Sequence, residues 1–401
     1  MGSGFRLEML WVLALGTLVG ACSPAVEKLW EFPTGSPLYS TPLVVDELIV
    51  FGSEGGTLHA VDRKGQARWR YSIPSGEIFS HPQTDGKLVF FGATNQKFYA
   101  LDMSGQVRWQ FAARERIKSD PTVSEGVVYT SSYDGHIYAL KADSGKLVWQ
   151  FPAEQDKKDK PADKAEGAAE GEKAKGDKPA DDKPADDKPE GDKAAEGKEP
   201  SGPGAFSYAA PVIRDGVLYV GNLDGSFYAL NTADGTLKWC FKTGGGITST
   251  ALVEGGTVYF GSKDDHVYAI DSATGTKVKW KFKTTDDVLS SPQLVDGVVY
   301  IGSNDKNLYA IDAETGKEKC HFSSQGQIIS YAVPYKDLVF FNGGQGDGCV
   351  YAIEAASCKL FYRYKTGYKI ESDPVFDGDR FYVTSGDNKL YAFKVNKTAK
   401  Q

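Results

Sequence analysis

One pattern of about forty residues returns eight times along the chain and constrains the fold more than any other feature. The typical unit has a small-residue step that usually ends in Pro, an alternating strand, a polar Gly/Asp turn, then aromatic-Ala-aliphatic, and finally a Gly, with Lys after it in some units, and a Trp, which Cys320 and Tyr362 replace in units six and seven. The alanine marks the third strand of each unit: Ala60, Ala100, Ala139, Ala229, Ala269, Ala310, Ala352 and Ala392. Repeats of this length are typical of propellers and solenoids.

The residue types within a unit indicate where each strand lies. Steps such as Ser40-Thr41-Pro42 precede the first strand, and their small side chains suit a crowded axis. Second strands such as Val127-Val128-Tyr129 are β-branched and aromatic throughout, as expected of strands buried on both faces. Turns such as Asp134-Gly135 supply residues that tolerate positive φ, so we interpret their acids as turn formers rather than ligands.

The two ends of the chain complete each other. The last unit stops at Leu390-Tyr391-Ala392-Phe393 with no outer strand after it, while Leu29-Trp30-Glu31-Phe32 precedes the first unit with no inner strands before it. Pairing them would remove exposed sheet edges, which a solenoid would not require. The sequence therefore predicts an all-β fold, an eight-bladed β-propeller of four-stranded blades that is closed by pairing the N-terminal strand with the last blade.

The N-terminus carries export features. Arg6 precedes an apolar run that is too short to span a bilayer, so we expect residues 1–21 to be a signal peptide. Val19-Gly20-Ala21-Cys22 resembles a bacterial lipobox, which implies lipid attachment at Cys22; an ordinary signal peptide with a chance cysteine is the alternative. Ser23 follows where Asp would imply retention in the inner membrane, so the expected destination is the outer membrane. Residues 22–401 would then form the propeller.

A charged insert interrupts the period at about residues 153–204. Residues 154–200 hold sixteen acidic residues and eleven lysines, with no aromatic or β-branched side chain to bury. Such a segment cannot offset its ordering entropy, so we expect a disordered spacer, with a specific docking segment as the alternative. The insert accounts for most of the formal charge of -7. The near-neutral remainder lacks the basic field that nucleic acid binding needs.

The segment Ala-x-Asp-x-x-x-Gly-x-x-x-Trp resembles the tryptophan-docking motif of the pyrroloquinoline-quinone-like propeller superfamily. The match is good from Ala229 to Trp239, apart from Asn231 in place of Asp. The resemblance implies that each Trp stacks on the motif Gly of the next blade. The docking residues would be Trp30, Trp69, Trp109, Trp149, Trp239 and Trp280, with Tyr362 at the Trp position of unit seven.

The same resemblance implies a disulfide. Cys320 stands at the Trp position of unit six and Cys358 at the Gly position of unit seven, which are the two places that the superfamily brings into contact. An exported compartment permits the bond, and two unpaired buried cysteines are the alternative. For Cys240 and Cys349 there is no such reason to pair.

Within that superfamily, an eight-bladed lipoprotein of about this length resembles the BamB-like propeller subunits of the outer-membrane β-barrel assembly machinery. This resemblance implies a monomeric, non-catalytic scaffold, tethered by its lipid to the periplasmic side of the outer membrane. Its protein partner would be the β-barrel assembly machinery, bound through loops and an exposed strand edge.

A quinone-dependent dehydrogenase is the second hypothesis, because the same repeat occurs in enzymes that hold a quinone and calcium on the axis. Those enzymes resemble one another in a ring disulfide between adjacent cysteines, and no two of the five cysteines here are adjacent. The chain also has no Cys-x-x-Cys-His for a haem. The histidines, His59, His81, His136, His266 and His321, show no metal-ligand spacing. We therefore expect no enzyme activity, no cofactor and no metal.

A third hypothesis is an exported ligand- or peptide-binding propeller, or a sensor, that uses an axial funnel. The candidates near the axis, from their place in the repeat, are His81, Gln83, Asp120, Gln293 and Asp373. A water-filled channel would need a polar lining in any case.

Overall fold

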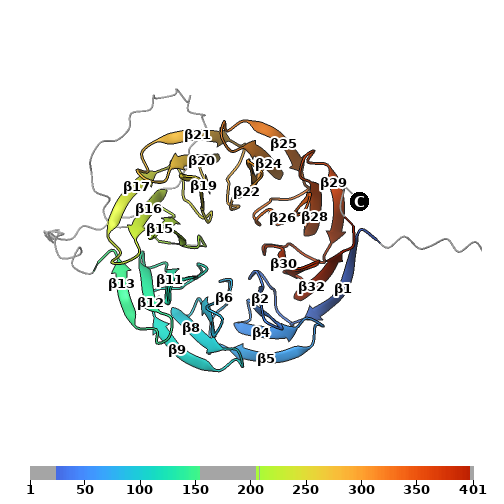
Figure 1. Cartoon of the computed structure of the whole chain (residues 1–401). Helices are drawn as coiled ribbons and strands as arrows, with labels where there is room; N and C mark the ends of the chain where they lie inside the picture. The colour runs from blue at the N-terminus through green and yellow to red at the C-terminus, as the bar shows by residue number, and fades with distance from the viewer. Residues whose placement is uncertain (1–23, 154–204, 207, 398–401) are drawn as a thin grey trace, which may run out of the picture.

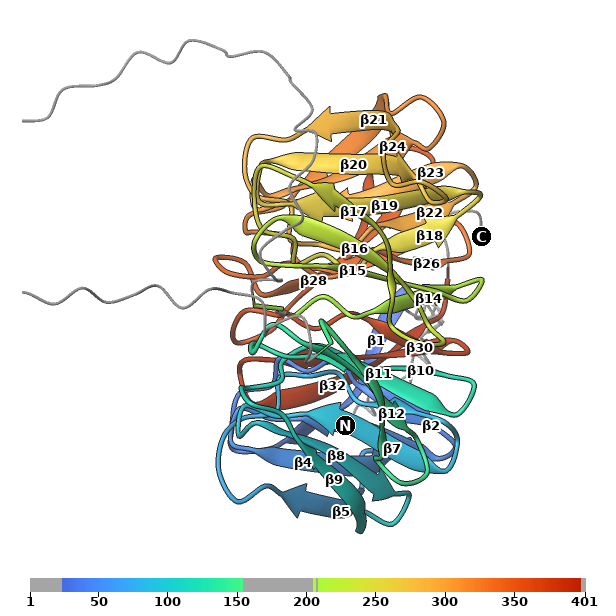
Figure 2. The ribbon, with the colours of Figure 1, turned by 90° about the vertical axis from the view of Figure 1, so that its left-hand side faces the viewer.

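The computed structural model describes residues 24–153, 205–206 and 208–397, which form a ring of eight four-stranded sheets around an axis (Figure 1). The strands run between the two faces of the ring, as the edge-on view in Figure 2 shows. The predicted all-β, eight-bladed propeller is confirmed. Among the described residues, no helix is long and apolar enough to cross a bilayer. The predicted signal peptide, Cys22 and all of the predicted insert after Ala153 lie outside these residues.

Each blade is an antiparallel sheet whose first strand lies at the axis and whose last strand lies on the circumference. Blade 1 contains β2 (Leu43–Val45), β3 (Leu48–Gly52), β4 (Thr57–Asp62) and β5 (Ala67–Ser72). Blade 2 contains β6 (Gln83–Thr84), β7 (Leu88–Gly92), β8 (Lys97–Asp102) and β9 (Val107–Ala112). Blade 3 contains β10 (Thr122–Ser124), β11 (Val127–Ser131), β12 (Ile137–Lys141) and β13 (Leu147–Phe151). Blade 4 contains β14 (Val212–Arg214), β15 (Val217–Gly221), β16 (Ser226–Asn231) and β17 (Leu237–Lys242).

The second half of the ring repeats this arrangement. Blade 5 contains β18 (Leu252–Glu254), β19 (Thr257–Ser262), β20 (His266–Asp271) and β21 (Val278–Lys283). Blade 6 contains β22 (Gln293–Val295), β23 (Val298–Gly302), β24 (Asn307–Asp312) and β25 (Glu318–Ser323). Blade 7 contains β26 (Val333–Tyr335), β27 (Leu338–Asn342), β28 (Cys349–Glu354) and β29 (Leu360–Lys365). Blade 8 contains β30 (Val375–Asp377), β31 (Arg380–Ser385), β32 (Lys389–Val395) and, as its outer strand, β1 (Val26–Pro33).

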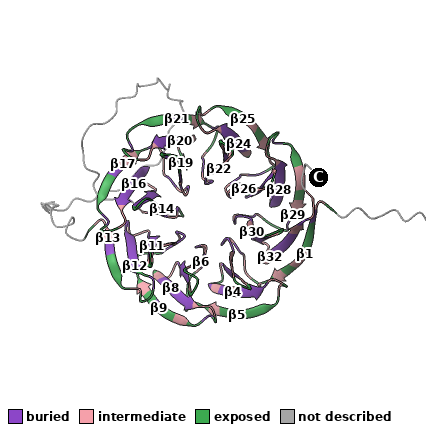
Figure 3. Ribbon diagram, in the orientation of Figure 1, coloured by how far each residue is buried: buried purple, intermediate pink, exposed green. Residues whose placement is uncertain are grey.

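The hydrophobic core lies on the second and third strands, which Figure 3 shows as the buried layer inside the exposed outer strands. In β7, for example, Val89, Phe90 and Phe91 are fully buried. These runs do not alternate between polar and apolar residues because both faces of the strand pack on neighbouring blades. The third-strand alanines are also buried, and each pairs with the residue at the Trp position of the outer strand, as Ala100 does with Trp109.

The ring closes through the chain ends, as expected. Strand β1 pairs antiparallel with β32, from Val26 opposite Val395 to Pro33 opposite Lys389. The Lys389 ammonium donates a hydrogen bond of 2.6 Å to the Glu31 carboxylate on β1, and Arg63 Nε of blade 1 lies 3.2 Å from Asp377 Oδ2 of blade 8. Blade 8 is thereby joined to its own outer strand and to blade 1.

Candidate functional site at the propeller axis

Neighbouring blades are fastened by tryptophans that cover glycines of the next blade. The pairs are Trp30 on Gly65, Trp69 on Gly105, Trp109 on Gly145, Trp149 on Gly235, Trp239 on Gly275 and Trp280 on Gly316. Each indole Nε1 donates a hydrogen bond of 2.7–3.2 Å to a carbonyl two or three residues before its glycine. A Cβ built on these glycines would lie 2.2–2.8 Å from the indole, and every one of them has positive φ, so no other residue fits without displacement.

Blades 6 and 7 are fastened differently. Cys320 and Cys358 form a disulfide with their Cα atoms 6.1 Å apart. Cys358 has φ of 55°, the left-handed conformation that glycine adopts at the equivalent positions. The Tyr300 hydroxyl donates to the Ala355 carbonyl at 2.8 Å, the acceptor that an indole would use here. Tyr362 occupies the Trp position of β29 opposite Ala352, and burial raises the pKa of Tyr362 to about 12.

The other two cysteines of the described chain form no disulfide. Cys240 is half-buried on β17 and Cys349 is fully buried on β28. Burial raises the pKa of both thiols, so neither has the character of an activated nucleophile.

At the axis, the segments that lead into the first strands form a ring of hydrogen bonds. The residue after the first small residue of each step occupies the same place in every blade, and where its side chain carries a short oxygen acceptor it accepts a hydrogen bond from the backbone N–H at the equivalent position of the preceding blade. Five of these bonds are formed: His81 N to Asp120 Oδ1 (2.7 Å), Ala210 N to Thr250 Oγ1 (2.9 Å), Thr250 N to Ser291 Oγ (2.8 Å), Tyr331 N to Asp373 Oδ1 (2.7 Å) and Asp373 N to Thr41 Oγ1 (2.8 Å). The three other acceptor positions hold His81, Ala210 and Tyr331, which lack a short oxygen acceptor.

Two carboxylates of this ring lie in different electrostatic environments. His81 Nδ1 is 2.8 Å from Asp120 Oδ2, and both side chains are largely buried. Burial lowers the pKa of His81, but the charge and hydrogen bond of Asp120, with a further contribution from Asp373, raise the net pKa above its ordinary value. Asp373 is 7% exposed, and its oxygens accept bonds only from the Tyr331 N–H and the Thr41 hydroxyl, which are neutral donors. Burial raises the pKa of Asp373 despite the attraction of His81.

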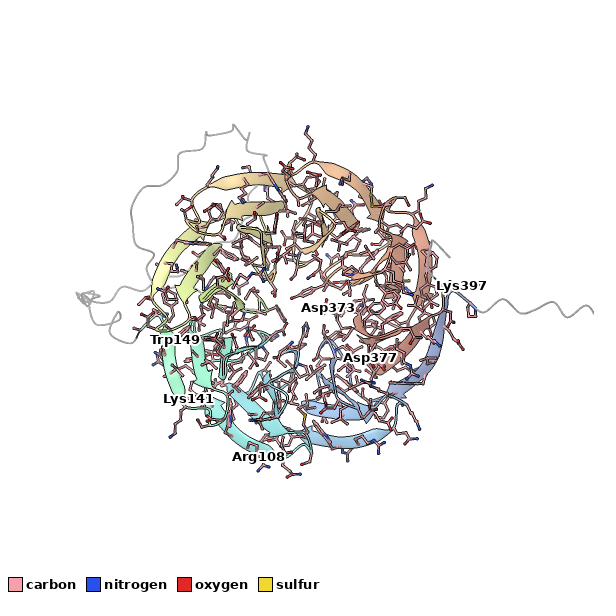
Figure 4. The ribbon with its side chains drawn as sticks, viewed as in Figure 1. Arg108, Lys141, Trp149, Asp373, Asp377 and Lys397 are labelled. Carbon is pink, nitrogen blue, oxygen red and sulfur yellow. A yellow bond between two sulfur atoms is a disulfide. The ribbon has the colours of Figure 1, made fainter. Side chains whose placement is uncertain are left out.

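These residues form the floor of a cavity of about 300 Å³ on the axis. Figure 4 labels Asp373 at the inner end of its blade, beside this axis. The cavity is lined by Tyr39, Phe79, His81, Asp120, Tyr208, Thr248, Thr250, Leu289, Ser291, Ile329, Tyr331, Glu371 and Asp373. All of these residues belong to the segments just before the first strands, so the cavity opens on the face of the ring where those strands begin, which we call the mouth face.

The cavity brings together three of the five predicted axial residues, His81, Asp120 and Asp373. Gln83 and Gln293 lie further along, on β6 and β22, and are not among its lining residues. The aromatic wall was missed from the sequence: Tyr39 and Phe79 stack at 6.1 Å with 14° between their ring planes. The residue that precedes the small-residue step differs in type between the units, so the repeat itself does not mark it.

Within the described residues, one group of acids approaches a metal-ligand arrangement. Oxygens of Asp265, Asp286 and Asp287 lie within 4.8 Å of one another, but Asp286 is exposed and Asp265 already faces the Lys283 ammonium at 3.7 Å. His136 and His266 each contact an Asp of their own turn, which is the equivalence that repetition produces.

A family model described as outer membrane protein assembly factor BamB matches the chain at residues 54–174, 242–329 and 321–401. No curated protein matches the chain significantly in sequence.

Solved structures show the same architecture at low sequence identity. BamB from Moraxella catarrhalis superposes with a TM-score of 0.68 at 17% identity, over 92% of this chain and 99% of that one. The computationally designed Ika8 protein superposes with a TM-score of 0.70 at 15% identity, over 92% of this chain and 100% of that one. Quinohemoprotein alcohol dehydrogenase ADHIIG from Pseudomonas putida HK5 superposes with a TM-score of 0.67 at 16% identity, over 94% of this chain and 77% of that one. At these identities the likeness concerns the fold alone. The family model covers well over half of the sequence, so the chain belongs to the family of outer membrane protein assembly factor BamB.

Proposed function

We propose that the protein is a non-catalytic scaffold in the assembly of outer-membrane β-barrel proteins, acting on the periplasmic side of the outer membrane, to which Cys22 tethers it by lipid. The observation that carries this proposal is membership of the BamB family. Its partner is the β-barrel assembly machinery, and the propeller acts through its surface.

The outer strand of blade 3 is the surface best suited to a protein partner. An outer strand leaves one row of backbone N–H and C=O groups unpaired, and natural proteins guard such edges with charged residues, especially lysine. Strand β13 reads Leu-Val-Trp-Gln-Phe and is the one outer strand of the eight described blades without a charged residue. Leu147 and Val148 on it are 46% and 44% exposed. An extended segment of a partner could therefore add to this edge by β-augmentation.

The position just before the Trp position shows this difference most clearly. It holds lysine or arginine in five outer strands, namely Arg68, Arg108, Lys238, Lys279 and Lys319. In β13 it holds Val148.

The cysteine arrangement supports a scaffold over a quinone-dependent enzyme. The resemblance to those enzymes leads one to expect a ring disulfide between adjacent cysteines, whereas the disulfide here joins residues 38 positions apart between two blades. Four of the five histidines are also engaged by carboxylates of the propeller itself, for example His81 by Asp120 at the axis and His136 by Asp134 in its own turn.

Affinity purification of the tagged, lipidated protein from gently solubilised membranes tests the proposal. We expect mass spectrometry to identify the β-barrel assembly core among the co-purified proteins. Recovery of the protein without that core would contradict the scaffold role.

A charged substitution on β13 tests whether this strand edge is the docking surface. Val148→Lys places on β13 the charge that five other outer strands carry, and we expect it to reduce recovery of the assembly core. Leu237→Lys is the matched control, because Leu237 is 45% exposed on β17, an outer strand that already carries lysines. Equal recovery with both variants would exclude β13 as the docking edge while leaving the scaffold role to the purification experiment.

A further inference from the structure

Three carboxylates line the axial cavity, those of Asp120, Glu371 and Asp373, and two of them form ion pairs with cationic side chains. Asp120 is paired with His81 at 2.8 Å, and Glu371 is paired with Lys369 at 2.5 Å. Asp373 is as buried as Asp120 but accepts hydrogen bonds from neutral donors only. An ionised carboxylate in such a place is costly unless a positive charge approaches it. The floor of the cavity is therefore built to attract a cation.

The mouth of the cavity presents aromatic ring faces that already hold ammonium groups of the chain. Lys118 Nζ lies 4.2 Å from the centroid of Phe79 and 5.5 Å from that of Tyr208. Lys369 Nζ lies 4.7 Å from the centroid of Tyr39. The negative face of an aromatic ring attracts cations, and ammonium ligands are recognised in this way. Neither lysine is among the residues that line the cavity itself.

The walls between mouth and floor carry apolar side chains from five of the eight blades. Leu289 and Ile329 line the cavity together with the aromatic rings of Tyr39, Phe79 and Tyr208. Such a wall offers no partner to the water shell of a small metal ion, but it packs well against methylene groups. A volume of about 300 Å³ suits a short carbon chain with a charged head.

We propose that the axial cavity binds an organic cation, with its ammonium or guanidinium head paired with Asp373 and its carbon chain packed against Leu289, Ile329 and the aromatic wall. A free small amine and a lysine or arginine side chain of a peptide share this chemistry. The site lies on the axis of the mouth face, apart from the β13 edge on the circumference, so it is independent of the scaffold role.

Calorimetric titration of the complete exported protein in detergent tests this site with three probes. n-Butylamine represents a free amine, N-acetyl-lysine methylamide represents a peptide side chain, and N-acetyl-norleucine methylamide keeps the carbon chain without the charge. We expect at least one cationic probe to bind and the norleucine probe not to bind. Binding of butylamine indicates a small-amine ligand, and binding of the lysine probe alone indicates a peptide. Failure of both cationic probes, or equal binding of the norleucine probe, would overturn the proposal.

Asp373→Asn keeps one oxygen acceptor for the Tyr331 N–H and places an amide NH2 beside the Thr41 hydroxyl, but it removes the charge, so binding of the cationic probe should weaken about tenfold or more. Asp296→Asn is the control, because Asp296 lies in the exposed turn between β22 and β23 on the opposite face. Phe79→Leu should weaken binding about two- to fivefold by removing part of the aromatic wall against which the carbon chain packs. If Asp373→Asn does not fold, the Phe79 variant decides: unchanged binding there would refute the site.

A proton measurement separates charge pairing from general packing. Burial raises the pKa of Asp373, and a cation beside it favours the ionised form, so binding should release protons at pH values near that pKa. The titratable groups facing it are His81, Asp120 and Tyr331, with Glu371 and Lys369 at the mouth. We expect proton release in calorimetry with two buffers of different ionisation enthalpy and its loss in Asp373→Asn. Binding without proton release would contradict pairing with Asp373.

Discussion

Exchanging the disulfide for a tryptophan-glycine pair would test how the blades are fastened. In six places an indole covers a glycine so closely that a built Cβ would lie 2.2–2.8 Å from the ring. Cys320→Trp alone should therefore collide with the Cβ of Cys358. Cys320→Trp together with Cys358→Gly should let the indole dock. The Ala355 carbonyl, already bonded to Tyr300, can accept a second donor, because the Ser272 carbonyl accepts from both an indole and a tyrosine in blade 5.

The free energy of unfolding lost with the disulfide is similar in size to the free energy gained from the new tryptophan and glycine. Loss of a disulfide that closes 38 residues costs about 4 kcal/mol through the entropy of the unfolded chain. Cys358→Gly returns about 1 kcal/mol because the residue has φ of 55°. A buried tryptophan contributes about 3–5 kcal/mol relative to alanine. The tryptophan-glycine double variant should therefore approach the wild type, whereas Cys320→Ser with Cys358→Gly should be about 3 kcal/mol less stable.

Urea unfolding with and without reductant measures the stability of the exported wild type, of Cys320→Trp, and of the tryptophan-glycine and serine-glycine double variants. We expect reductant to lower the midpoint of the wild type and to leave that of the tryptophan-glycine variant unchanged. We also expect Cys320→Trp alone to be the least stable variant, because it loses the disulfide and gains a clash. The reasoning is refuted if the tryptophan-glycine variant unfolds at the same urea concentration as the serine-glycine variant.

Three further changes test the ring. Gly145→Ala should cost about 2–4 kcal/mol, because its Cβ would meet an indole at 2.4 Å and its φ is positive, while Gly126→Ala, with nothing within 4 Å, should cost less; urea midpoints compare them. Trp30→Ala should cost about 3–5 kcal/mol in the same assay, since it loosens the blade that closes the ring; a cost below about 1 kcal/mol would contradict that role. The folded-state pKa of His81 is raised above 6.5, so its pairing with Asp120 stabilises the protein below pH 6.5 and is lost as pH rises through the folded-state pKa. Asp120→Asn should flatten this decline in urea midpoint between pH 5.5 and 8.5, and an unchanged pH profile would show that the pair does not titrate as described.

The fold was predictable because each blade repeats the same short sequence pattern. Ala60 and its seven equivalents are all buried, and each pairs with the Trp position of an outer strand, so one recurring triplet located every third strand. The closure by β1 followed from counting outer strands.

The site was only partly predictable because it depends on contacts between units. His81 and Asp120 were expected near the axis, but their ion pair joins residues 39 positions apart, and the repeat does not specify which equivalent positions face each other at 2.8 Å. Tyr39 and Phe79 occupy a position whose residue type varies from unit to unit, so no periodic signal marked it. The unguarded edge of β13 was likewise visible only by comparing all outer strands.

The pairing of β1 with β32 also sets an order of events during folding. Val26 pairs with Val395, so the first strand of the ring stays without its partner until nearly the whole chain has been synthesised. Contacts across such a separation are slow to form. Until then the nascent protein has two open ends, at β1 and at the most recently completed blade, and both can attract other extended chains. We therefore expect the protein to need protection from other extended chains while it folds. This need ends when β32, the last strand, pairs with β1.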